Sequence, residues 1–200
     1  MLGKLIKYEW KNTGKICGSL ILFMVLMTVL GCLSFCTPMW SGMFSDNFSG
    51  MTPMDMVGFL TLFLYILALV GVSYGMIIYL GVHFYRSMYS DEGYLTHTLP
   101  VTSHQLLISK TLVAGLWYLL IGLVMILSVF CLVFTVIQRA MGYQGINIFE
   151  ELAANWGEVV SAIEMMLGGS LLKEVLFYLL QIIVGTFSSV LILFGAVTIG

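Results

Sequence analysis

Four long stretches of apolar residues alternate with polar segments along this chain. The stretches cover residues 16–36, 57–82, 111–137 and 175–200, and none of them contains Asp, Glu, Lys or Arg. A helix rises about 1.5 Å per residue, so about 20 apolar residues cross the ~30 Å hydrocarbon core of a bilayer. The pattern therefore predicts an all-α fold, a polytopic transmembrane helix bundle with four spans in a single domain.

Residues 2–15, before the first stretch, show a weak amphipathic pattern. Leu2, Leu5, Ile6 and Trp10 share one face of a helix, and four lysines supply most of the polar remainder. Such a segment is typical of a short helix that lies in the membrane interface, with its tryptophan at headgroup depth.

The third connection contains the clearest amphipathic helix, predicted over residues 147–168. Gly168 and Gly169 are expected to end it. We expect an external helix that lies on the membrane surface or caps the bundle. Its apolar side chains recur at steps of three and four residues: Phe149, Leu152, Trp156, Val160, Ile163 and Leu167.

The second connection, residues 85–110, is compact and polar. Aromatic residues up to Tyr89 prolong the preceding helix beyond its apolar stretch, and Asp91 can cap a short transverse helix. Pro100 ends that helix. Thr102 and Gln105 then form a capping-box pattern for the next helix, which runs through Lys110. Exposed aromatic and aliphatic groups on such a hairpin suit the docking of a soluble partner, and the alternative is a hairpin that lies against its own bundle.

Composition and charge agree with a membrane protein and orient it. The chain is 60% hydrophobic and 9% charged, whereas soluble domains carry about 25% charged residues. By the positive-inside rule, the N-terminus and the 85–110 loop are predicted to be cytoplasmic. Six basic residues then lie inside (Lys4, Lys7, Lys11, Lys15, Arg86 and Lys110), and Arg139 and Lys173 lie outside.

Several classes of chemistry lack the residues that they need. The four stretches contain no ionisable acid or base to carry a coupling ion, which disfavours ion-coupled transport. No phosphate-binding loop, HExxH motif or Ser/His/Asp arrangement occurs, so we expect no enzymatic activity and no cofactor. We likewise expect no disulfide framework, no metal site at His83, His97 and His104, and no nucleic-acid partner.

Two further patterns carry hypotheses of their own. Gly71 and Gly75 form a GxxxG pair that would allow close helix packing. The first connection is rich in methionine, whose thioethers can bind Cu(I), although flexible methionines also fill gaps at a bilayer surface. A copper site there would use Met39, Met43, Met51 and Met54.

The basic start LGKLIKYEWKNTGK and the segment FYRSMYSDEGYLTHTLPVTSHQLLISK resemble permease subunits of bacterial ABC transporters of the ABC-2 type. Such permeases often carry an acidic-Gly-Tyr-Leu-Thr-x-Thr-Leu-Pro-Val loop between their second and third spans. The corresponding residues here are Asp91, Glu92, Gly93, Tyr94, Leu95, Thr96, Thr98, Leu99, Pro100 and Val101.

This resemblance implies a function. The chain would be the permease subunit of an ATP-driven exporter in the bacterial cytoplasmic membrane, paired with a second permease half as a homodimer or heterodimer. A separate ABC ATPase would dock on a coupling helix in the 85–110 loop. Members of this family usually have six spans, so we expect a six-span domain cut short, and the transported substrate does not carry over. The docking residues implied are Asp91, Glu92, Gly93, Tyr94, Leu95, Thr96, Leu99 and Pro100.

A rival hypothesis needs no ATPase. In this reading the chain is a membrane sensor or immunity protein, in which the outer acidic helix detects a peptide and the 85–110 loop signals inward. A membrane enzyme is the weakest alternative, because no pair of nucleophile and base can be named.

Overall fold

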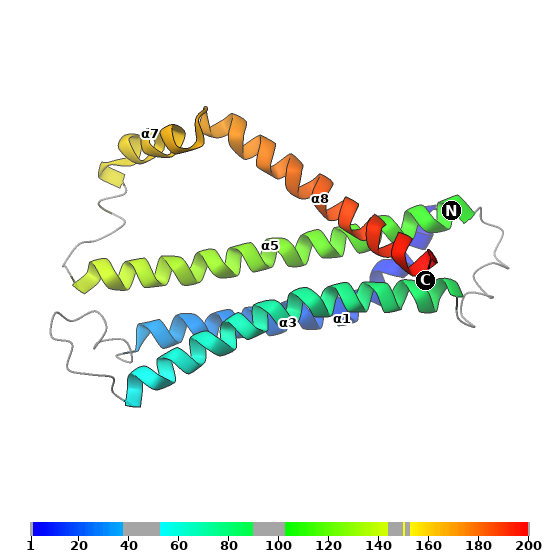
Figure 1. Cartoon of the computed structure of the whole chain (residues 1–200), viewed down its shortest axis with the longest axis horizontal. Helices are drawn as coiled ribbons and strands as arrows, with labels where there is room; N and C mark the ends of the chain where they lie inside the picture. Colours follow the sequence, from blue (N-terminus) through cyan, green and yellow to red (C-terminus); the bar gives the residue numbers. More distant parts are fainter. Residues whose placement is uncertain (1, 38–52, 90–102, 144–149, 151–152, 200) are drawn as a thin grey trace. The chain divides into compact units, whose positions relative to one another are not determined.

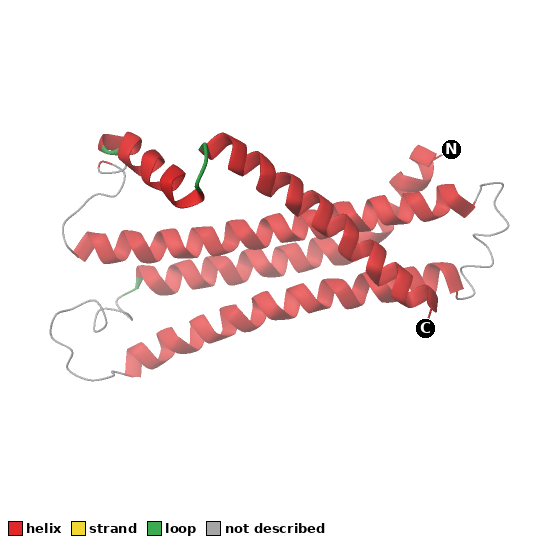
Figure 2. Ribbon diagram, turned by 45° about the horizontal axis from the view of Figure 1, so that its top comes forward, coloured by secondary structure: helices red, strands yellow, loops and turns green. Residues whose placement is uncertain are grey.

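The computed structural model describes residues 2–37, 53–89, 103–143, 150 and 153–199, and the described part of the chain is almost entirely helical, without strands and with only short loops (Figures 1 and 2). The helices are α1 (Leu2–Cys36), α3 (Pro53–Tyr89), α5 (Ser103–Tyr143), α7 (Trp156–Leu167) and α8 (Leu171–Ile199). Four of them, all except α7, are long and apolar enough to cross a membrane. The predicted all-α fold with four spans is therefore confirmed.

The long helices exceed the apolar stretches that predicted them. α3 continues to Tyr89, as the aromatic residues beyond its stretch predicted. α5 begins at Ser103 and runs through Lys110 without interruption. Residues 2–15 join the first stretch in one continuous helix, α1, rather than forming a separate element. No proline interrupts residues 2–36, and single glycines in a helix cost only about 1 kcal/mol each, so nothing breaks α1 at the edge of its apolar part.

The chain divides into two compact units, and each of the four long helices contributes one part to each of them. Unit 1 comprises residues 1–24, 69–125 and 182–200, and unit 2 comprises residues 25–68 and 126–181.

Unit 1 is built around buried side chains from α1, α3, α5 and α8. Phe84 of α3 stacks on Phe194 of α8, with ring centroids 3.9 Å apart. Trp10 of α1 stacks on Trp117 of α5 at 4.5 Å. α8 approaches α5 so closely that a Cβ placed on Gly115 would lie 2.5 Å from the ring of Phe187. The fully or nearly buried apolar residues of this unit are Cys17, Met24, Val72, Met76, Leu80, Phe84, Leu106, Val113, Ala114, Trp117, Ile121, Val190 and Phe194.

Unit 2 is held together by hydroxyl groups. The Ser128 hydroxyl of α5 lies 2.6 Å from the Thr28 hydroxyl of α1 and 2.7 Å from the phenol of Tyr65 of α3. Ser34 and Thr61 form a second pair at 2.9 Å. Hydroxyls of this kind join neighbouring membrane helices without placing a charge in the bilayer.

The guanidinium of Arg139 caps the end of α1 in unit 2. It donates to the carbonyl oxygens of Phe35 and Cys36 in the last turn of α1, where side-chain donors commonly satisfy helix carbonyls.

α7 covers only the later part of the helix predicted over residues 147–168, because it begins at Trp156, directly after a bend at Asn155. It ends at Gly168, as predicted, and Gly168 adopts φ 75°, with its N–H bonded to the carbonyl of Glu164. A positive φ favours glycine, which explains why the helix ends here. Trp156 of its apolar face is exposed. Whether this helix lies on the membrane surface or caps the bundle stays a prediction.

Candidate functional site

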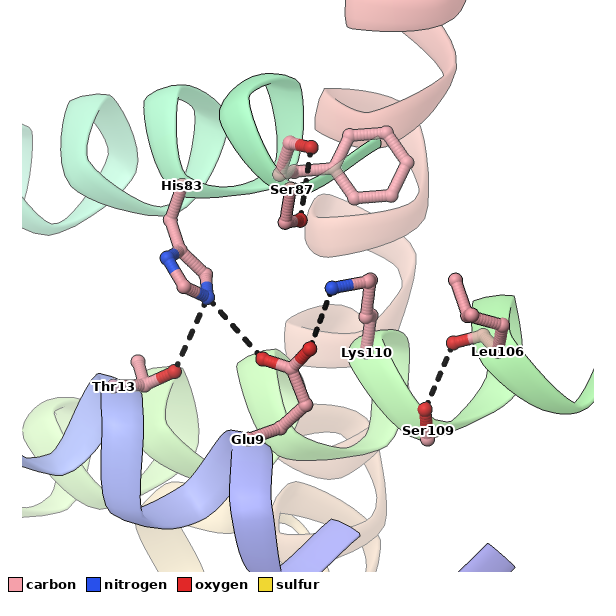
Figure 3. A network of polar contacts seen from close by, with 8 residues as sticks. Glu9, Thr13, His83, Ser87, Leu106, Ser109 and Lys110 are labelled. Atoms are coloured by element: carbon pink, nitrogen blue, oxygen red, sulfur yellow. Dashed lines mark hydrogen bonds and ion pairs between the residues drawn. The ribbon is translucent and has the colours of Figure 1, made fainter. Parts of the chain in front are cut away.

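The most unusual arrangement in unit 1 is a buried polar network that joins α1, α3 and α5 (Figure 3). The Lys110 ammonium donates to Glu9 Oε1 at 2.5 Å. The other carboxylate oxygen, Oε2, lies 3.3 Å from Nε2 of His83, and the same nitrogen lies 3.5 Å from the Thr13 hydroxyl. We call these four residues the Glu9 network.

Helical periodicity places these polar groups on inward faces. Glu9, Thr13 and Cys17 follow one another at intervals of four residues on α1, and all three are buried. His83 adjoins the buried Phe84 on α3, and Lys110 adjoins the fully buried Ser109 on α5. Each polar group therefore points into the unit because its helix places it there.

Burial makes the pairing of these charges necessary. Glu9 is 9% exposed and Lys110 is 6% exposed. A buried charge without a partner costs several kcal/mol, so the carboxylate and the ammonium depend on each other. Because a carboxylate can only accept hydrogen bonds, its contact with His83 requires the imidazole proton to be on Nε2.

A small cavity adjoins the network. It measures about 10 Å³, room for about one water molecule. Glu9, Thr13, His83 and Lys110 line its polar side, and Phe84 and Phe194 are among its apolar lining residues. The neighbouring hydroxyls of Ser87 and Ser109 donate to carbonyls of their own helices, as Figure 3 also shows.

The network lies close to the helix ends that carry the predicted coupling loop. His83 is about two turns before the end of α3 at Tyr89, and Lys110 is about two turns after the start of α5 at Ser103. Among the described residues there is no group of three or more side chains suited to a metal ion. The Glu9 network joins three helices at the base of the loop.

None of the residues predicted to dock an ATPase, bind copper or pack helices belongs to the Glu9 network. The predicted docking residues, Asp91, Glu92, Gly93, Tyr94, Leu95, Thr96, Leu99 and Pro100, lie outside the described residues, as does His97. Met39, Met43 and Met51 also lie outside them. Gly71 and Gly75 lie on α3, and a Cβ built on either glycine would meet no described atom within 4 Å. Close helix packing at these two glycines stays a prediction. The partner helix would have to lie outside the described residues or belong to another chain.

Sequence reasoning missed the Glu9 network. Glu9 is the only acidic residue among the lysines of residues 2–15, which is typical of a solvated charge. The available signal was its place in the otherwise uncharged stripe of Leu2, Leu5, Ile6 and Thr13. A carboxylate on such a face needs a cation from another helix.

The hydroxyls of the spans behave as membrane helices require. Ser128 bonds across helices, and Thr135 and Ser189 donate to the carbonyls of Leu132 and Gly185 in their own helices. All four cysteines are free thiols.

Comparison with known protein families, with curated proteins and with solved structures gives no match to this chain.

Proposed function

We propose that the chain is the permease subunit of an ATP-driven ABC exporter of the ABC-2 type. It forms part of the substrate pathway together with a second permease half, and a separate ATPase docks on the 85–110 loop. The likeness of residues 91–101 to the coupling loop of such permeases suggests this function.

The observation that carries the proposal is the Glu9 network. An ATPase that pushes on a loop moves the membrane helices only if the base of the loop is stiff. The contacts of Glu9 with Lys110 and His83 link α5 and α3 through α1 near that base. In this proposal the three helices move as one body when the ATPase closes.

The proposed location is the bacterial cytoplasmic membrane, with the N-terminus and the 85–110 loop inside. The four helices that are long and apolar enough to span a membrane support a multi-pass protein. The concentration of basic residues before the first span and around the 85–110 loop supports the orientation.

An affinity pull-down tests the proposal. The tagged full-length protein is isolated from its own host in mild detergent, and the bound proteins are identified by mass. We expect a soluble ATPase at about one copy per permease, lost in the double variant Tyr94→Ala with Leu99→Ala. The matched control is Leu22→Ala with Phe23→Ala, since both side chains are exposed on the apolar part of α1.

Two results would count against the proposal. If no ATPase is recovered with folded protein, the sensor or immunity hypothesis takes its place. If the ATPase is recovered equally well with the Tyr94 and Leu99 double variant, another part of the chain holds it.

A further inference from the structure

A second cleft lies in unit 1, and the proposed transport function assigns it no ligand. It lies between α1 and α3 and has a volume of about 340 Å³. Its lining residues are Asn12, Ile16, Tyr79, Val82, His83 and Arg86. Polar and apolar side chains are both present, which is typical of a site for an amphipathic ligand.

The cleft lies where the apolar part of each helix ends. Ile16 is the first residue of the apolar stretch 16–36, and Val82 is the last of the stretch 57–82. Asn12 and Arg86 follow one helical turn further out on their helices. In a membrane, this boundary is the depth of the lipid phosphates and glycerol groups, where tyrosines such as Tyr79 also gather.

Among the described residues, the charge beside the cleft is positive. In the described part of unit 1, Glu9 is the only carboxylate, and it takes part in both ion pairs found there. Arg86 is therefore paired with no described carboxylate. Lys11 and Lys15 are exposed on α1, on either side of Asn12 in the sequence. Such a field attracts an anion to the cleft.

We propose that this cleft binds the headgroup of an anionic phospholipid. The guanidinium of Arg86 bonds the phosphate, since guanidinium groups match phosphate oxygens in geometry and charge. The amide of Asn12 supplies a neutral donor beside it. Ile16 and Val82 contact the glycerol and the upper acyl chains. These apolar residues favour a lipid over free phosphate, which would leave that half of the cleft in contact with water.

Lipid binding here is linked to the Glu9 network through His83. This side chain lines both the lipid cleft and the small inner cavity. A headgroup seated between α1 and α3 bridges two of the helices that the network also joins. The bound state of unit 1 is therefore more stable than the empty state, by linkage.

Thermal unfolding of the purified full-length protein tests the proposal. The protein in detergent is titrated with phosphatidylglycerol or with phosphatidylcholine of the same acyl composition. We expect phosphatidylglycerol to raise the unfolding midpoint with saturation, and phosphatidylcholine to raise it much less. Arg86→Gln should weaken the apparent affinity for phosphatidylglycerol by about fivefold to tenfold, the effect of one interfacial charge with its hydrogen bonds.

Two variants serve as controls. Lys7→Gln removes the same charge from unit 1 at an exposed position outside the cleft, and it should leave the affinity within about twofold of the original. Asn12→Asp adds a carboxylate to the cleft and should weaken binding even if Arg86→Gln fails to fold.

Three results would overturn the proposal. The first is equal stabilisation by the two lipids. The second is an equal loss of affinity in Arg86→Gln and Lys7→Gln. The third is saturation of the same stabilisation by inorganic phosphate alone, which would make the cleft a phosphate site without a lipid.

Discussion

The two units use opposite charges and different polar chemistry. The described part of unit 1 contains six basic residues and one acidic residue, Glu9, whereas that of unit 2 contains two basic and five acidic residues. The interior of unit 1 contains an ion pair, and that of unit 2 contains the hydroxyl chain of Thr28, Ser128 and Tyr65.

This difference determines how the polar contacts of each unit respond to the loss of one partner. A buried ion pair is stabilising only while both partners are present, because the loss of one leaves an uncompensated charge. A hydroxyl can fall back on a carbonyl of its own helix, as Thr61 does with Gly58. The loss of one partner of the Glu9–Lys110 pair should therefore be more damaging than the loss of one hydroxyl of the chain of Thr28, Ser128 and Tyr65.

The prediction with the largest expected effect concerns the orientation of the chain in the membrane, and its outcome is all or none. In a variant whose four cysteines are replaced by alanine, one new cysteine is placed at Lys4 in unit 1 or at Met165 on α7, which is 85% exposed. We expect an impermeant maleimide to label Met165→Cys in intact cells and Lys4→Cys only after permeabilisation. Labelling of both from the same side would contradict the orientation.

Next in size is the loss of the ion pair. Lys110→Met leaves Glu9 buried without its cation and should lower the free energy of unfolding by about 3–5 kcal/mol. The double variant Lys110→Met with Glu9→Gln removes both charges and should recover most of this loss. The free energies of unfolding are measured in detergent micelles. Equal destabilisation of the single and double variants would mean that Glu9 and Lys110 are not energetically coupled.

Two glycines give a smaller contrast. A Cβ on Gly115 of unit 1 meets the Phe187 ring at 2.5 Å, while one on Gly31 of unit 2 meets a methyl of Leu132 at 3.1 Å. Gly115→Ala should cost about 1–3 kcal/mol, the usual effect of overpacking. Gly31→Ala should be close to neutral, because the methyl can move and alanine favours the helix. The same unfolding assay compares the two variants. A larger loss of stability in Gly31→Ala than in Gly115→Ala would contradict this prediction.

The smallest expected effect is in the hydroxyl chain. Ser128→Ala removes the central hydroxyl between Thr28 and Tyr65 and should cost about 0.6 kcal/mol, with about 1.7 kcal/mol as the upper limit for such bonds. Ser189→Ala is the control, since Ser189 bonds only the Gly185 carbonyl among the described groups. A loss comparable to that of Lys110→Met would show that unit 2 is as sensitive as unit 1.

The fold was largely predictable because hydropathy alone sets the requirement for spanning helices. The described residues of each apolar stretch lie within one long helix, and Gly168 ends α7 as its position predicted. The exact ends were less predictable, since no local signal separates residues 2–15 from the rest of α1.

The candidate site was not predicted from the sequence. Glu9, His83 and Lys110 are far apart in the chain. His83 and Lys110 adjoin apolar stretches, and Glu9 lies among the lysines before the first stretch, where charged or polar residues normally anchor a helix in the interface. Only the packing of three helices shows that these residues meet. The residues that carried the resemblance, from Asp91 to Val101, lie outside the described part, so the interpretation of that loop stays a prediction.

The separation of Glu9 from its partners in the sequence has a consequence for biosynthesis. Lys110 follows Glu9 by 101 residues and His83 follows it by 74. At about 5–20 residues per second, translation supplies the ammonium roughly 5–20 s after the carboxylate. His83 arrives first, so an imidazole is the earliest partner available to Glu9 while the nascent chain is still being inserted. The completed ion pair then marks the moment at which the third helix has joined the first two.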